Sequence, residues 1–196
     1  GRVTQCHVLT GAALDAALGD VARLRIAVFR DWPYLYDGDL DYERRYLAAF
    51  RASPQAVVVG AYDGNTLVGA ATAAPLSDHA DDFAQAFDGT GVNIGDVFYC
   101  AESVLLADYR GQGIGHRFFD AREDAARAFG FTKSAFCAVQ RPDDHPLRPA
   151  DYRPLDTFWR KRGYAPLDGA IARFTWTDVD ADAPTAKPLQ VWIKDL

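Results

Sequence analysis

The 196-residue sequence predicts an α/β fold, built on a mixed, mostly antiparallel twisted sheet flanked by helices. Two apolar, β-prone runs surround Asp63-Gly64-Asn65, a turn sequence typical of a hairpin. A strand, a glycine-rich turn, a helix and a second strand follow one another over 97–139, which is the order of a βαβ unit with parallel strands. We expect residues 1–196 to form a single domain.

The N-terminal half predicts a strand, two helices and the hairpin. Residues 4–10 begin as a strand that Gly11 ends, and apolar residues at three- to four-residue spacing then predict a helix over 13–31. These apolar residues are Leu14, Leu18, Val21, Leu24 and Val28. A second helix over 42–50 ends at Ser53-Pro54, because a residue before proline avoids the helical conformation.

The C-terminal half predicts further strands around two helices. Residues 78–89 favour a short helix, and the apolar run 96–106 favours a central strand. The helix after the glycines has an apolar stripe that ends before Gly130: Ile114, Phe118, Ala121, Ala125 and Phe129. The remaining elements are a strand at 133–139, a proline-rich loop at 141–154, a short helix at 155–164, and strands at 171–178 and 189–196.

Composition excludes several classes of function. A formal net charge of −6 and a pI near 5.1 argue against capture of nucleic acid or anionic lipid. No run approaches the about 18 apolar residues of a membrane span, so we expect a cytoplasmic protein. Cys6, Cys100 and Cys137 form no CxxC pair and the histidines show no ligand spacing, so we expect no metal. The C-terminal strands would allow a homodimer.

The segment "RGQGIG", residues 110–115, is the strongest functional signal. Backbone N–H groups at a helix N-terminus attract anions, and glycines remove the Cβ atoms that hold a phosphate away. The spacing does not fit the dinucleotide pattern G-x-G-x-x-G, which needs glycine where His116 or Phe118 stands. A Walker loop needs a Lys-Ser/Thr pair that is missing here. The turn therefore predicts a diphosphate site of another kind.

This segment resembles the signature R/Q-x-x-G-x-G/A of the GNAT superfamily of N-acetyltransferases. Every position matches: Arg110, Gly111, Gln112, Gly113, Ile114 and Gly115. The resemblance implies a GNAT fold and transfer of an acetyl group from acetyl-CoA to a primary amine of a small molecule or peptide by direct attack. In the family, the turn holds the CoA diphosphate. The strand end at Val104, Leu105 and Leu106 pairs with pantetheine, and a nearby backbone N–H polarises the thioester carbonyl.

The resemblance also implies a base and an acid. Glu102 interrupts the apolar strand, where burial would make its carboxylate a better base, and a satisfied carboxylate paired with Arg25 is the alternative. Asp96 is a weaker substitute for the base. Relatives carry a tyrosine acid where Trp159 stands here, so Trp159 is expected to contact the cofactor. Tyr152 is the candidate acid, with a contact to pantetheine or departure of the thiolate without a dedicated acid as the alternatives. The departure at Trp159 leaves a non-catalytic acyl-CoA-binding module as the rival function.

In this family the segment between the first two helices lines the acceptor pocket. Here that segment supplies Trp32, Tyr34, Tyr36 and Asp37, an aromatic and acidic set suited to a cationic amine with apolar bulk. A solvated turn whose aromatic rings pack into the core is the alternative for each of these residues.

Overall fold

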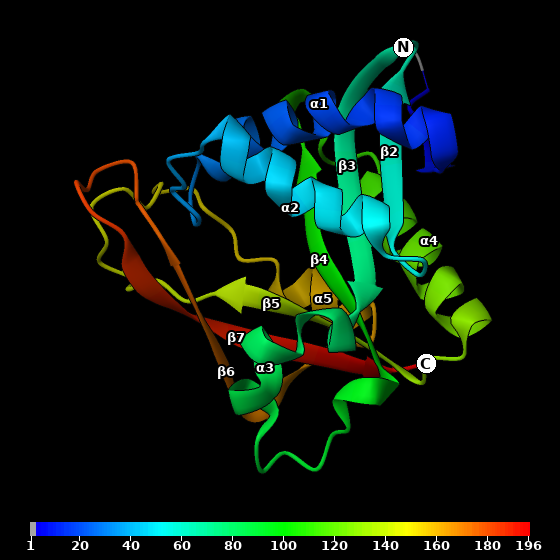
Figure 1. Cartoon of the computed structure of the whole chain (residues 1–196). Helices are drawn as coiled ribbons and strands as arrows, with labels where there is room; N and C mark the ends of the chain where they lie inside the picture. Colours follow the sequence, from blue (N-terminus) through cyan, green and yellow to red (C-terminus); the bar gives the residue numbers. More distant parts are fainter. Residues whose placement is uncertain (1–2) are drawn as a thin grey trace.

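The computed structural model describes residues 3–196, which hold one seven-stranded sheet in the order β1-β2-β3-β4-β5-β7-β6 (Figure 1). The β4–β5 pair is parallel, and the other neighbouring pairs are antiparallel. The strands are β1 (Gln5–Leu9), β2 (Val57–Asp63), β3 (Thr66–Pro75), β4 (Val97–Leu105), β5 (Lys133–Val139), β6 (Ala165–Trp176) and β7 (Thr185–Asp195). The predicted mixed, mostly antiparallel α/β fold is thereby confirmed.

Helices cover both faces of the sheet. Helices α1, α2 and α3 lie on one face, and α4 lies on the opposite face, where the aromatic residues of α5 join its apolar cluster (Figure 1). The helices are α1 (Gly11–Phe29), α2 (Leu40–Ala52), α3 (Ala80–Phe87), α4 (Ile114–Phe129) and α5 (Asp156–Lys161), with 3₁₀ turns at Leu76–His79, Ile94–Asp96 and Ala107–Tyr109. None of the helices in the described residues combines the length and apolar character needed to cross a bilayer.

Strands β4 and β5 pair over only a short stretch. The parallel register joins Val97–Tyr99 of β4 to Lys133–Ala135 of β5, and the two strands then separate. From Tyr99 onward β4 continues beside β3, whereas β5 continues beside β7. We call the diverging segments, residues 100–105 and 136–139, the β4–β5 fork. Within residues 3–196 no strand pairs with β4 on its fork side, which is the arrangement of a sheet edge that an extended ligand can join.

A β-bulge in β4 decides which side chains face α1 and α2. The β3–β4 register pairs Thr72 with Glu102 but Ala73 with Cys100, so Ala101 is an extra residue in β4. Tyr99 packs with the cluster under α3, and after the bulge Val104 packs with the cluster under α1 and α2. Strict alternation would send every even-numbered residue of β4 to the α4 face. The bulge therefore brings Glu102 to the same face as Tyr99.

The buried face of α4 differs from the predicted stripe. Phe129 is 41% exposed, whereas Phe119, Arg122 and Glu123 are buried together with Ala126. The prediction followed apolar residues alone, and the structure buries two charged residues of this helix because other groups satisfy them. Strand β6 is also longer than predicted, since Ala165 and Pro166 pair with β7 before a register shift to Ile171.

Glu123 fastens α4 to α5 and β7. Its carboxylate accepts hydrogen bonds from Lys194 (2.7 Å), Arg162 (2.9 Å) and the Tyr164 hydroxyl (3.0 Å). Burial of Glu123 opposes its ionisation, but the hydrogen bonds from Lys194 and Arg162 lower the pKa of Glu123 overall. A carboxylate with a lowered pKa stabilises the fold above its unfolded pKa and loses that contribution as pH falls through its folded pKa.

Replacing Glu123 with glutamine tests this network. We expect Glu123→Gln to lower the free energy of unfolding at pH 7 by about 3 kcal/mol, because two cations lose a buried carboxylate partner. The deficit should shrink as the pH falls from the ordinary glutamate pKa of about 4.3 through the lower folded pKa of Glu123, because the native carboxylate then becomes protonated as well. Urea unfolding at pH 7 and at acidic pH measures this loss of unfolding free energy. Asp124→Asn, which changes the exposed neighbour, is the control. A deficit that stayed constant with pH would contradict the assignment.

Candidate active site

The glycine turn, residues 110–115, leads from β4 into α4. Gly111 and Gly113 both have φ of +79°, the left-handed region that favours glycine, and a Cβ added to either would meet no atom within 4 Å. Gly113 is the N-cap residue of α4 and, as a glycine, has no side chain to cap the helix. The first N–H groups of α4 have no partner within the helix and carry the positive end of its dipole. The turn thus has the backbone geometry of an anion site.

Gly115 has a different role in the packing. A Cβ there would lie 3.3 Å from Cζ of Phe158, so the missing side chain lets α5 approach the first turn of α4. Ile114 is 1% exposed and packs in the core, which leaves its backbone as the part open to a ligand. The predicted clearance for an anion is therefore present at Gly111 and Gly113, whereas the space beside Gly115 is filled by protein.

Two side-chain contacts hold the start of the turn in place. The Tyr109 hydroxyl donates to Oδ2 of Asp63 at 2.6 Å, which ties the turn to the β2–β3 hairpin. Arg117 donates to the Thr4 carbonyl oxygen at 2.8 Å, so its charge is directed toward β1. Arg110 is exposed, and its guanidinium lies 3.5 Å from the Leu105 carbonyl oxygen. Of the two arginines near the turn, Arg110 is the more available to an anion.

The end of β4 presents backbone rather than side chains. The Val104 side chain is 1% exposed and packs under α1. Leu105 packs against the opposite cluster, on the α4 side of the sheet. The Leu106 N–H donates to the Val68 carbonyl oxygen at 3.0 Å and is therefore taken by β3. A ligand that pairs with this strand end must use backbone groups on the fork side of residues before Leu106.

Glu102 lies in a buried ionic group that we call the Arg25 cluster: Arg25, Glu43, Tyr46 and Glu102. The Arg25 guanidinium forms ion pairs with both carboxylates, whose side chains are 0% exposed for Glu43 and 6% for Glu102. The Tyr46 hydroxyl donates to Oε2 of Glu102 at 2.8 Å, and Arg25 lies 4.3 Å from the centroid of the Tyr46 ring. The predicted alternative of an Arg25–Glu102 pair is present in the structure.

Two carboxylates and one guanidinium give the Arg25 cluster one excess negative charge. Burial opposes the charge on Arg25, but Glu102, Tyr46 and Glu43 together raise the pKa of its guanidinium. Burial and the adjacent Glu102 raise the pKa of Tyr46 well above the usual range, so Tyr46 stays a neutral hydroxyl. The cluster can therefore accept a positive charge or a proton from a ligand on this side of the fork.

Tyr34 lies between this cluster and the 141–154 loop. Burial raises the pKa of Tyr34. The neighbouring groups Cys137, Glu102 and Tyr152 raise the Tyr34 pKa further, and Arg25 opposes this shift. The ring of Trp32 lies 6.2 Å from that of Tyr152. The structure thus brings three sequence-predicted residues, Tyr34, Glu102 and Tyr152, into one neighbourhood, with Trp32 at its side.

The other predicted site residues are directed elsewhere. Tyr36 forms a hydrogen bond to Glu43 and packs edge-on to Tyr42, with ring centroids 6.5 Å apart. The Asp37 carboxylate is exposed and lies 3.7 Å from the Arg30 guanidinium. Trp159 packs between Phe136 and Trp192, at ring distances of 4.8 and 5.0 Å. For Tyr36 and Asp37 these contacts are those of the predicted core or solvated-turn alternatives.

Asp96 and Cys137 fit poorly as reacting groups. Asp96 is exposed and precedes Val97–Tyr99, the part of β4 that pairs with β5, so it lies at the closed end of the fork. Burial raises the pKa of the Cys137 thiol to about 12, against a smaller opposing effect of the Tyr99 hydrogen bond. A thiol with that pKa is a poor nucleophile at neutral pH. Residues 3–196 hold no group of three or more metal-ligating side chains.

Arg141 joins the loops around Tyr34. Its guanidinium donates to the carbonyl oxygens of Pro33 (2.8 Å) and Tyr34 (2.7 Å) and to both carboxylate oxygens of Asp178 (2.8 and 3.0 Å). One side chain at the end of β5 therefore fixes the α1–α2 connection and the β6–β7 connection together. Although burial opposes ionisation of Asp178, Arg141 and Lys187 lower its pKa, which keeps this clamp charged.

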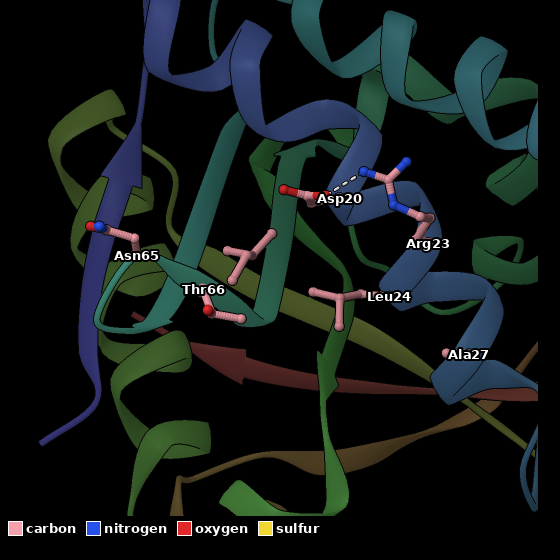
Figure 2. A pocket seen from close by; sticks show the side chains of 7 residues that line it. Asp20, Arg23, Leu24, Ala27, Asn65 and Thr66 are labelled. Carbon is pink, nitrogen blue, oxygen red and sulfur yellow. Dashed lines mark hydrogen bonds and ion pairs between the residues drawn. The ribbon is translucent and has the colours of Figure 1, made fainter. Parts of the chain in front are cut away.

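A separate depression lies outside this site. It has a volume of about 450 Å³ and lies between α1 and the β2–β3 hairpin (Figure 2). Its lining includes Asp20, Arg23, Leu24 and Thr66, and Asp20 forms an ion pair with Arg23 (Figure 2). It contains no residue of the glycine turn, the fork or the Arg25 cluster, so we assign it no part in the chemistry.

Comparison with known proteins agrees with this geometry. The model of the acetyltransferase (GNAT) family matches residues 22–149. The chain belongs to this GNAT family. It is therefore an acyl-CoA-dependent N-acyltransferase that uses acetyl-CoA as co-substrate. No curated protein matches the sequence.

Solved GNAT structures share the fold at low identity. A putative acetyltransferase from Acinetobacter baylyi is 11% identical with a TM-score of 0.66, covering 100% of this chain and 93% of its own. A ribosomal-protein-alanine N-acetyltransferase from Brucella melitensis is 14% identical with a TM-score of 0.64, covering 98% and 99%. A putative acetyltransferase from Salmonella typhimurium with acetyl-CoA is 13% identical with a TM-score of 0.62, covering 99% and 94%.

Sequence reasoning missed Glu43, Tyr46 and Arg122 in this GNAT protein. Each stands on a helix, and Arg122 and Glu43 are charged residues at positions that the packing buries. A charged residue on the apolar side of a helical pattern is the signal that could have identified Glu43 and Arg122, whereas Tyr46 carries no such signal. Arg25, the predicted alternative partner of Glu102, carries the same signal.

The glycine turn gives a direct test of co-substrate binding. We expect Gly113→Val to weaken CoA binding more than about tenfold, because a side chain enters the open space and a branched residue strains a φ of +79°. Calorimetric titration with CoA measures the affinity. Gly89→Val is the matched control, since Gly89 has φ of +74° and equal open space but lies in the loop after α3. Equal affinities for both variants would contradict the assignment.

Proposed function

We propose that this protein transfers the acetyl group of acetyl-CoA to a primary amine of a small molecule or peptide by direct attack, without an acyl-enzyme. The single observation that carries the proposal is the position of Glu102, a carboxylate turned by the β4 bulge toward α1 and α2 beside the open fork. The poor nucleophile at Cys137 supports direct attack over a covalent intermediate.

Acetyl-CoA supplies the activated acyl group, and the chain's own groups would bind and orient it. The N–H groups at Gly111 to Gly115 would hold the diphosphate, with Arg110 and Gln112 exposed beside them. The fork side of Val104 and Leu105 would pair with the extended pantetheine. The fit rests on the two left-handed glycines with nothing within 4 Å of an added Cβ and on an α4 N-terminus without a side-chain cap.

Glu102 would accept the proton that the amine loses. Tyr46 donates to Oε2 and Arg25 pairs with Oε1, so the carboxylate is held in one orientation. The excess negative charge of the Arg25 cluster favours an acceptor that arrives as an ammonium ion. Transfer of that proton to Glu102, and from Glu102 to solvent, leaves the neutral amine that attack requires. The second proton, which the nitrogen loses after attack, would replace the one that Tyr152 gives to the leaving thiolate.

Tyr152 is the proposed donor to the leaving thiolate. Burial and Asp156 raise the pKa of Tyr152, with Arg148 opposing, so its hydroxyl is protonated at neutral pH and can donate. Trp159 cannot supply this proton, because its indole N–H does not titrate. Trp159 packs on Phe136 and Trp192, which favours a structural role: it would stabilise the β5 side of the fork, next to the proposed cofactor position.

The acceptor would enter past Trp32, Tyr34 and Tyr36, with Asp37 at the outer rim. Aromatic faces beside buried carboxylates suit a cationic amine with apolar bulk. The similar structure from Brucella melitensis is a ribosomal-protein-alanine N-acetyltransferase, which supports including peptide amines in the acceptor class. We also propose that residues 1–196 act as one domain.

A panel of amines tests the function. We expect thiol release from acetyl-CoA that depends on an added primary amine, with faster release for aromatic or alkyl monoamines and short peptides than for anionic amino acids. A thiol-reactive dye measures the rate. CoA binding in calorimetry with no amine-dependent thiol release over the whole panel would contradict the proposed transfer.

Replacing the proposed base gives the second test. We expect Glu102→Gln to lower kcat about 100-fold, because the proton acceptor is lost, with little change in CoA affinity. Asp96→Asn is the matched control, since it removes a carboxylate near the other end of the same strand. A Glu102→Gln variant with the full kcat would move the base to another residue.

A further inference from the structure

Arg122 of α4 is a buried cation that the proposed chemistry does not use. Its side chain is 1% exposed, and no carboxylate of the described residues lies within ion-pair distance of it. Removing a charge from water costs several kcal/mol, and a buried cation without an anionic partner is unusual. The groups that surround Arg122 show what offsets this cost.

The guanidinium is satisfied by the bulge of β4. Nη1 donates to the carbonyl oxygens of Glu102 (2.9 Å) and Thr72 (3.2 Å), and Nη2 donates to the Ser103 hydroxyl (2.8 Å). Nε donates to the Phe118 carbonyl oxygen of its own helix at 3.2 Å. The two strand carbonyls belong to Thr72 and Glu102, the register pair next to the extra residue Ala101. A bulge disrupts the ladder at this point, and Arg122 supplies donors there.

We propose that Arg122 is the positioning residue that keeps Ala101 in the bulge and thereby keeps Glu102 facing α1 and α2. Without the bulge, the two-residue period of a strand would turn residue 102 toward α4, away from Tyr46 and Arg25. The planar guanidinium can reach two carbonyls and a hydroxyl at once, a geometry that lysine cannot reproduce. The inference rests on the proposed role of Glu102 as base.

A double-mutant cycle distinguishes positioning from general support of the fold. If Arg122 acts through Glu102, Arg122→Met should lower kcat at least about tenfold in the native background but less than about twofold in the Glu102→Gln background. CoA affinity should change less than about threefold, because the glycine turn is not altered. Arg127→Met is the matched control, an exposed arginine of the same helix that should keep full turnover. Thiol release with the best amine of the panel, or with water as acceptor if no amine is used, gives the rates.

Two further measurements keep the test decisive. Arg122→Lys serves if Arg122→Met folds poorly, and hydrogen exchange serves if Glu102 is not the base. Arg122→Lys should retain the fold and show an intermediate kcat, since one nitrogen replaces three. Hydrogen exchange of the 97–105 peptide should be at least about tenfold faster in Arg122→Met or Arg122→Lys, while the 57–63 peptide of β2 is unchanged.

The possible outcomes separate the two proposals. Additive losses in the cycle, or unchanged exchange in β4, overturn the positioning role of Arg122. Full turnover of Glu102→Gln overturns the base instead, and the exchange result then decides whether Arg122 holds the bulge. Loss of CoA binding in Arg122→Lys would show that Arg122 supports the co-substrate site and would overturn a role exerted through Glu102.

Discussion

The extra residue at Ala101 is the constraint on which the site depends. It divides β4 into a first part whose odd-numbered residues face α3 and a second part whose even-numbered residues face α1 and α2. Tyr99 and Glu102 therefore share a face although they are three residues apart. The same irregularity breaks the β3–β4 ladder, and a buried guanidinium from the opposite face of the sheet donates to its carbonyls. Packing on the α4 side and chemistry on the α1–α2 side are thus coupled through one strand.

The separation of β4 and β5 is the second constraint. Three residue pairs join the strands at Val97–Tyr99, and then β5 follows β7 while β4 follows β3. A sheet that stayed paired would bury the backbone of β4 and leave no room for an extended ligand. Because the two strands separate, the edge of β4 on the fork side is unpaired, within the described residues, from Glu102 to the end of the strand. The chain then continues into the glycine turn, where the N–H donors lie. A diphosphate and a thioester at the two ends of one extended molecule fit these two positions.

Turn residues and their spacing predicted the features that depend only on neighbouring residues in the sequence. The hairpin at Asp63–Asn65 and the glycine turn follow from turn residues and spacing, and the structure has them where predicted. The surroundings of Glu102 were predicted only as two alternatives, because its partners come from α1 and α2, far away in sequence. The bulge was invisible, since no residue type marks Ala101 as the extra one. Arg122 was missed because its acceptors are backbone carbonyls, which every sequence contains.

The glycine turn at the end of β4 and the Arg25 cluster beside it carry opposite electrostatic character, which fits the proposed pairing of an anionic co-substrate with a cationic acceptor. On the fork end, uncapped N–H groups of α4 and Arg110 favour the anionic co-substrate. On the α1–α2 side, two buried carboxylates share one guanidinium, so a cationic acceptor gains a charge partner that the anionic co-substrate does not. A single continuous pocket of one polarity would bind only one of the two reactants well. In the proposed reaction, the distance along β4 would let each reactant approach a complementary field while their reacting atoms meet at the fork.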